Sequence, residues 1–147
     1  DLTKLREVYR NKGFLDVSIE QNGVAIIPRG TGKLDIVIKL EEGKRSYFGQ
    51  SVLIGNVVLS TPELQEDSSI REGKPYSPAL LSEERNRLRK MYGEKGYLDA
   101  RVLSVRTPNL KTQQIDLRFQ ITENNKFSVN SVLVRGNDKT KTIAIIR

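Results

Sequence analysis

The sequence contains no cysteine and no histidine, and aromatic residues make up only 6% of its 147 residues. Without cysteine, a disulfide framework and thiolate chemistry are both excluded. The lack of histidine also excludes an ordinary zinc site, so we expect neither a bound metal nor a cofactor. No apolar run approaches the ~20 residues that a membrane-spanning helix requires. A signal-peptide pattern is missing at the start, and we interpret the sequence as a piece of a longer protein.

What the chain does have is a basic charge balance and enough apolar residues for a core. Its formal net charge is +7, and 37% of its residues are hydrophobic. That composition suits one domain or two small ones. A basic balance is compatible with nucleic acid or anionic lipid as a partner, or with a solvated surface alone. The positive residues are scattered rather than gathered in a tail, which favours the solvated surface.

One stretch of the chain occurs twice. Residues 5–19, LREVYRNKGFLDVSI, return at a constant offset as residues 88–102, LRKMYGEKGYLDARV. The identical pairs are Leu5/Leu88, Arg6/Arg89, Tyr9/Tyr92, Lys12/Lys95, Gly13/Gly96, Leu15/Leu98 and Asp16/Asp99, and Phe14 is matched by Tyr97. Self-similarity at a fixed period indicates a repeat architecture.

The first copy predicts a helix followed by a hairpin. Its apolar residues Leu2, Leu5, Val8 and Tyr9 fall on one helical face, and Gly13 can end the helix. Residues 15–19 then begin a strand, 28–32 form a turn, and 34–40 alternate between apolar and polar as a half-buried strand does.

The second copy is preceded by further elements. Over 47–59 we expect a strand that ends at Gly55-Asn56 and then a turn. A short helix that Thr61 caps and that runs to about Ile70 follows, and a second helix starts at Ser77-Pro78. In the second helix we expect a buried stripe that consists of Leu81, Leu88, Met91 and Tyr92. The polar face of this helix would carry Glu83, Glu84, Arg87 and Lys90. A strand over 98–105, a turn at 107–109 and an alternating strand over 115–121 follow.

These elements define a β-α-α-β-β unit of about eighty residues. Residues 44–124 form one complete repeat, and residues 1–43 form the last half (α-β-β) of another. Residues 125–147 start a third, because 131–137 (SVLVRGN) mirrors 51–56 (SVLIGN) with one extra residue. No Gly/Ser-rich or Pro-rich linker separates the copies, so we expect repeats in close series.

The unit has three marks: a strand that ends in Gly-Asn, a glycine and a Tyr-Ser pair between the helices, and Tyr-x-x-x-Gly-Tyr before the second strand. They fall at Gly55, Asn56, Gly136, Asn137, Gly73, Tyr76, Ser77, Tyr92, Gly96 and Tyr97, with Tyr9 and Gly13 in the first copy. In this order and spacing, they resemble the POTRA (polypeptide-transport-associated) family, and most closely the tandem repeats of outer-membrane β-barrel assembly factors.

The resemblance implies a fold, a place and partners. The fold would be α+β, with a three-stranded mixed sheet covered on one face by two antiparallel helices. Such repeats lie in the periplasm, ahead of a membrane β-barrel in the same chain. They receive unfolded outer-membrane proteins and dock accessory lipoproteins, without enzymatic activity.

The family's sheet places its first strand beside its third and leaves the second at an edge. An edge strand can pair with an incoming extended chain through its backbone. We therefore expect a peptide-binding edge whose residues are Ala100, Arg101, Val102, Leu103, Ser104 and Val105, with Leu15–Ile19 as its counterpart. Arg101 and Arg106 would flank it and attract acidic clients. The alternative is that these charges blunt the edge against pairing.

Other interpretations remain open. Gly96 could end a helix or form a contact loop, and we favour the helix end. The repeated aromatic residues could belong to the core and its boundary or form a stacking platform, and we favour the core. Gly93–Gly96 also fits the GXXG loop of KH domains, but a strand pattern follows it, so we expect no nucleic-acid partner. Within the POTRA class, two-partner secretion and organellar import transporters are alternatives. Finally, we expect strand-swapped self-association, in which residues 126–147 of one molecule complete residues 1–43 of another.

Overall fold

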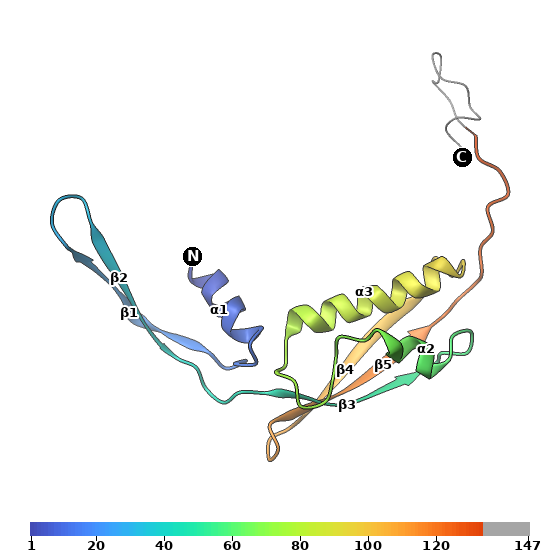
Figure 1. Cartoon of the computed structure of the whole chain (residues 1–147), viewed down its shortest axis with the longest axis horizontal. Helices are drawn as coiled ribbons and strands as arrows, with labels where there is room; N and C mark the ends of the chain where they lie inside the picture. Colours follow the sequence, from blue (N-terminus) through green and yellow to red (C-terminus); the bar gives the residue numbers. More distant parts are fainter. Residues whose placement is uncertain (134–147) are drawn as a thin grey trace.

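The computed structural model describes residues 1–133, apart from the side chain of Gln21 (Figure 1). Its elements are α1 (Leu2–Arg10), β1 (Ser18–Pro28), β2 (Leu34–Glu41), β3 (Tyr47–Ile54), α2 (Thr61–Glu66), α3 (Pro78–Glu94), β4 (Arg101–Asn109) and β5 (Gln114–Thr122). Across this described part of the chain, no helix has both the length and the apolar character that crossing a membrane demands.

The strands form two sheets. In the three-stranded sheet the order is β3-β5-β4, where β3 runs parallel to β5 and β4 runs antiparallel to it. The hairpin of β1 and β2 is a separate two-stranded sheet. The predicted mixed three-stranded sheet, with its first strand beside its third, is therefore confirmed.

Both α2 and α3 pack on one face of the three-stranded sheet, and the core lies between them (Figure 1). The alternation of β5 is the reason: Ile115, Leu117, Phe119 and Ile121 are buried while the residues between them face the open side. Other core residues include Phe48, Leu64, Tyr76, Leu81, Leu88, Tyr92 and Val102.

The start of α2 is one residue earlier than expected, and its end comes sooner. Ser60, not Thr61, is the N-cap, because it forms a capping box with Glu63 in which the Glu63 carboxylate accepts the Ser60 N–H at 2.8 Å. The helix ends at Glu66 and does not continue to Ile70. The Ser68 hydroxyl accepts the N–H of Ile70 at 3.2 Å, a local turn that competes with helix continuation.

Glu84 does not belong to a solvated face of α3, as the sequence suggested, but is only 4% exposed. The Arg87 guanidinium lies 2.7 Å from its carboxylate and supplies the countercharge that a buried carboxylate requires. The same guanidinium donates to the carbonyl oxygen of Leu64. Glu84 therefore holds the arginine that ties α3 to α2.

The strand boundaries also differ from expectation. β4 begins at Arg101 and runs through the predicted turn at 107–109 to Asn109. Pro108 is tolerated because β4 is an edge strand, where a proline need not donate to the ladder. The turn lies at 110–113 instead, where the Asn109 side chain accepts the N–H of Lys111 at 3.1 Å. β3 ends at Ile54, directly before the predicted turn at Gly55-Asn56. Residues 15–17 precede β1, so the strand predicted over 15–19 begins later than expected.

The marks of the repeat have structural roles where they are described. Gly55 has φ 84°, and a Cβ there would lie 2.2 Å from the carbonyl oxygen of Ile121, so only glycine fits after β3. The side-chain amide of Asn56 donates to the Leu59 carbonyl oxygen at 3.0 Å and shapes the turn into α2. Gly73 donates its N–H to the carbonyl oxygen of Phe48. Gly136 and Asn137 lie outside the described residues, and residues 131–133 are not in a strand.

The two copies of the duplicated stretch end in the same backbone junction. Gly13 and Gly96 have φ of 99° and 92°. The Gly13 carbonyl oxygen accepts the N–H of Ser46 at 2.8 Å, and the Gly96 carbonyl oxygen accepts the N–H of Phe127 at 2.8 Å. Each glycine thus follows a helix and holds a residue that lies about thirty positions further along the chain, Ser46 before β3 and Phe127 after β5.

A side-chain contact strengthens the first junction. The Asn11 side-chain oxygen accepts the hydroxyl of Ser77 at 3.0 Å and the N–H of Ala79 at 3.1 Å. Ser77 is the N-cap of α3, so a residue that follows α1 completes the cap of a helix in the next repeat.

Candidate functional site

The candidate site is the outer side of β4, which we call the β4 edge. Within residues 1–133, β4 pairs with β5 alone, in one unbroken register from Arg101 to Asn109. Pro108 has no N–H, and a proline in an edge strand places its nitrogen on the unpaired side. Because the alternation has a period of two, Val102, Ser104 and Arg106 also direct their backbone groups outward. The β4 edge therefore offers N–H and C=O groups to an added strand.

The side chains of β4 divide between the two faces of the sheet. Val102 is 6% exposed and belongs to the core, and Ser104 is half-buried beneath α3. Arg101, Leu103 and Val105 lie on the open face, where Leu103 is 61% exposed. Ala100 is 8% exposed and precedes the strand. Only the residues from Arg101 onward thus belong to the edge that pairing would use.

Beside the β4 edge runs a concave region of about 260 Å³, which we call the α3–β4 groove. It is lined by Tyr76, Pro78, Leu81, Arg85, Ser104 and Arg106. Arg106 lies here, as expected of a residue that flanks the edge. Arg101 instead lines a separate hollow with Asp99 and Asn124, at the other end of the strand. The structure therefore does not bring the two predicted flanking arginines together.

Sequence reasoning missed Tyr76 and Arg85 as members of this region. Tyr76 is fully buried and packs against Phe48 with its ring tilted, the ring centroids lying 4.9 Å apart. The Tyr76 hydroxyl and the Nε atom of Arg85 are both buried and have no hydrogen-bond partner within the described part of the chain. One signal was available: Arg85 lies between Leu81 and Leu88 at helical spacing, on the edge of the buried stripe.

The repeated aromatic residues form boundary pairs. Tyr92 and Tyr97 meet edge to face with centroids 6.4 Å apart, and Tyr9 and Phe14 do the same at 6.1 Å. Tyr92 is fully buried, and burial, with the nearby Glu123 carboxylate as a second cause, raises the pKa of its hydroxyl.

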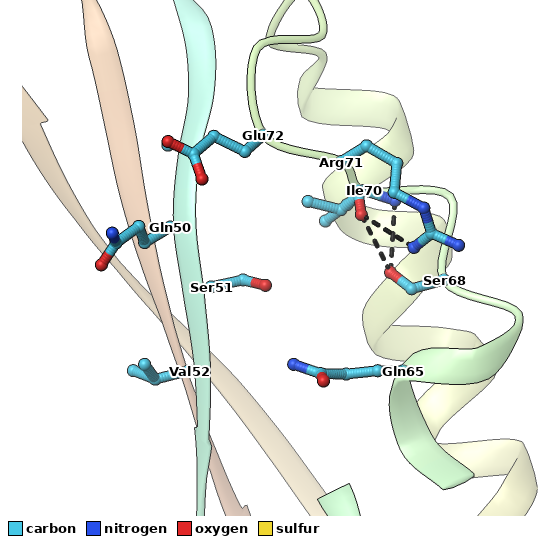
Figure 2. Close-up of a pocket in the computed structure, with 9 residues that line it drawn as sticks. Gln50, Ser51, Val52, Gln65, Ser68, Ile70, Arg71 and Glu72 are labelled. Atoms are coloured by element: carbon cyan, nitrogen blue, oxygen red, sulfur yellow. Dashed lines mark hydrogen bonds between the residues drawn. The ribbon is translucent and has the colours of Figure 1, made fainter. Parts of the chain in front are cut away.

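A second concave region lies at the opposite border of the sheet, between β3 and the segment from α2 to Glu72. Figure 2 shows Ser51 and Gln65 facing one another across it, while Gln50 and Val52 point away from the helices. The Ser68 and Arg71 side chains hydrogen-bond locally to Ile70. Part of this border is already used, because Phe48 donates to the carbonyl oxygen of Lys74 and accepts from Gly73. The β4 edge is the more open of the two.

Comparison with protein families gives one match. The model of the POTRA family, described as surface antigen variable number repeat, matches residues 46–124. The matched segment begins at the residue that Gly13 anchors, includes all of β3, α2, α3, β4 and β5, and contains both the β4 edge and the α3–β4 groove.

Curated relatives match along the whole chain. The outer membrane protein assembly factor BamA of Neisseria meningitidis is 28% identical over 152 residues, and that of Neorickettsia risticii is 27% identical over 148 residues. Each match covers 100% of this chain but only 18% and 20% of the relative. The chain thus spans about a fifth of the length of these relatives.

Solved structures show the same fold. The BamA POTRA3-5 structure from Haemophilus influenzae superposes with a TM-score of 0.67 at 19% identity, covering 99% of this chain and 57% of that one. The BamA POTRA4 structure of the same organism has a TM-score of 0.50 at 20% identity, and the match covers 56% of this chain and 98% of that one. These similarities show the fold.

Proposed function

Because this chain belongs to the POTRA family, we propose that it is part of the POTRA region of an outer-membrane protein assembly factor, on the periplasmic side of the outer membrane. The matches to BamA over the full length of the chain support this assignment. The parent chain would continue into a membrane β-barrel, and this part would bind without catalysing a reaction. Two-partner secretion and organellar import transporters are the alternatives within the family.

The proposed activity is capture of unfolded outer-membrane proteins by β-augmentation. The observation that carries it is the β4 edge, which pairs with no strand within residues 1–133. Backbone hydrogen bonds recognise an extended chain without reference to its side chains. Such recognition suits a receptor for many clients whose common property is a tendency to form strands. Capture along β4 would extend the sheet to four strands and hold the client in an extended form for insertion.

Lipoproteins of the Bam complex are the second proposed class of partner. This proposal depends on the similarity to BamA. A nucleic-acid partner is not proposed, because Gly93–Gly96 forms the end of α3 and leads into β4, whereas the GXXG loop of a KH domain joins two helices.

The binding experiment uses the whole chain and extended peptides copied from outer-membrane β-strands, with amide chemical shifts followed by NMR. We expect weak binding, with a Kd on the order of 0.1–1 mM, since ordering the peptide offsets much of the contact energy. The largest shifts should fall on residues 101–106. Shifts that cluster on β3, or none at millimolar peptide, would contradict the proposal.

A proline tests the backbone contact directly. Val102 is the first candidate, but its side chain is buried, so a proline there would also disturb the core. Ser104→Pro removes an outward N–H from a half-buried position instead. We expect it to weaken binding by about 3- to 10-fold, the value of one hydrogen bond. Ser104→Ala is the matched control: it keeps the N–H and should bind as the wild type does.

A further inference from the structure

The α3–β4 groove contains two hydrogen-bond donors that lack acceptors. The Tyr76 hydroxyl and the Arg85 Nε are both buried and without a partner within residues 1–133. Buried donors in folded proteins are nearly always paired with an acceptor, and an exception calls for an explanation. Both residues line the same concave region, together with Arg106.

The charge of the α3–β4 groove is of one sign. Arg85 and Arg106 both line it, and none of its lining residues is acidic. Within residues 1–133 the Arg85 side chain makes one hydrogen bond, a long one from its terminal nitrogen to the Ser82 hydroxyl at 3.4 Å. Guanidinium groups bind planar carboxylates through paired N–H donors, and the Tyr76 hydroxyl can add a third.

The position of the groove determines what would enter it. The side chains of Ser104 and Arg106 lie on the face of β4 that α3 covers. In a strand added to the β4 edge, residues opposite these two would place their side chains on the same face. One side chain of a bound client strand would therefore point between Arg85 and Arg106.

We propose that the α3–β4 groove is a specificity pocket for a carboxylate side chain, Glu or Asp, of an extended chain paired with the β4 edge. The inference rests on the proposed capture of extended chains and adds a side-chain preference to it. Backbone pairing alone would accept any strand. The pocket would favour strands with an acidic residue opposite Ser104 or Arg106 and would set the register in which they bind.

The test compares two peptides that differ in one group. Both are eight-residue Thr/Val strands with blocked termini, so that one central Glu supplies the only carboxylate, and in the partner peptide Gln replaces it. Affinity is measured by NMR titration of the full chain at about 0.15 M salt. We expect the wild-type chain to bind the Glu peptide about tenfold more tightly, as one charge-assisted hydrogen bond would give.

Variants then locate the preference. Arg85→Gln and Arg106→Gln should each reduce the preference to about threefold or less. Tyr76→Phe should lower it without destabilising the fold, since the Tyr76 hydroxyl has no hydrogen-bond partner within residues 1–133. Arg118→Gln is the matched control, because Arg118 lies on β5 with its side chain on the open face, away from the groove. It removes the same charge and should keep the tenfold preference.

The outcomes separate this inference from the proposed function. If the Gln peptide binds along residues 101–106 and the Glu peptide gains less than twofold, the carboxylate pocket is wrong while strand capture stands. An equal loss of preference in Arg118→Gln would also overturn it, since net charge and not the pocket would then be responsible. If neither peptide binds on β4, both proposals fail.

Discussion

Strands β2 and β5 have the same alternating sequence pattern but lie in different structural environments. Both alternate apolar and polar residues, and Ile36 corresponds to Leu117 by position in the repeat. Leu117 is 2% exposed, whereas Ile36 is 60% exposed. In the complete repeat β5 is the central strand between β3 and β4, and in the half-repeat β2 pairs only with β1 among the described residues.

The difference shows what makes the core of this fold. An alternating strand supplies one apolar face, but burial requires a partner strand on each side and a layer of helices above. The complete repeat has α2 and α3 over its sheet, whereas α1 has no buried residue. The half-repeat therefore has the pattern of a core without the neighbours that would bury it.

The largest expected effect is self-association that supplies those neighbours. Residues 126–133 lie in the segment that corresponds to the start of β3, and Val129 and Leu133 are 82% and 75% exposed. We expect this segment of one molecule to pair with the free side of β2 in another, as in domain swapping. Light scattering at rising concentration should show a mass approaching twice 16.7 kDa. A chain shortened to residue 125 is the control, and a strictly monomeric particle at millimolar concentration would remove the idea.

A matched pair of core substitutions measures the contrast directly. Leu117→Ala removes a buried side chain and should lower the free energy of unfolding by about 2–5 kcal/mol. Ile36→Ala acts on the corresponding exposed position and should cost less than about 0.5 kcal/mol at concentrations where the chain is monomeric. Urea unfolding followed by circular dichroism gives both values. Similar losses at the two positions would mean that β2 is buried in solution.

Local signals in the sequence predicted much of the fold. The alternation over 115–121 gave β5 and its buried face, and Ser77-Pro78 gave the start of α3. Other features depend on contacts that sequence neighbours do not show. Glu84 is buried only because Arg87 reaches Leu64 on another helix, and β4 continues through Pro108 only because it is an edge strand.

Part of the candidate site could likewise be predicted from the sequence, and part of it depends on contacts that form only in the folded chain. The position of β4 at the edge followed from the resemblance to the POTRA family, and Arg106 at the groove followed from its place on that strand. Tyr76 and Arg85 meet β4 only in the folded repeat, because Tyr76 belongs to the segment before α3 and Arg85 to α3 itself. No spacing between three separate segments could have brought these residues together in advance.

The junction between the repeats offers a second contrast, of intermediate size. Asn11→Ala removes the acceptor for Ser77 and Ala79 and should cost about 1 kcal/mol, as the loss of a helix cap does. It should also widen the distance distribution between the repeats. Because the chain has no cysteine, spin labels on cysteines introduced at Lys33 and Lys111 report that distance by pulsed EPR.

The corresponding residue at the second junction is Glu94, whose side chain is 64% exposed. Glu94→Ala should leave the Lys33–Lys111 distance distribution unchanged. Ser60→Ala, which weakens a cap inside one repeat, should lower stability without widening that distribution. Widening of equal size in Ser60→Ala would show that general loosening, and not the loss of the Asn11 contact, controls the angle between repeats.

The smallest expected effect depends on pH and compares Glu123 with Glu42, its equivalent in the half-repeat. Burial acts to raise the pKa of Glu123, but the N–H groups of Val58 and Val57, at 2.9 and 2.7 Å, lower it on balance below its ordinary value of 4.5. A lowered pKa in the folded state stabilises the protein above the unfolded pKa, and this contribution disappears as pH falls through the folded pKa.

Glu123→Gln should therefore cost up to about 1 kcal/mol at pH 7, after allowance for solvent screening, and much less at pH 3. Glu42→Gln should cost little at either pH, since no hydrogen bond to Glu42 side-chain oxygens is found within residues 1–133. Thermal unfolding of the two variants at both pH values measures these costs. If the stability that Glu123→Gln loses is as large at pH 3 as at pH 7, packing and not the charged hydrogen bonds stabilises the turn after β3.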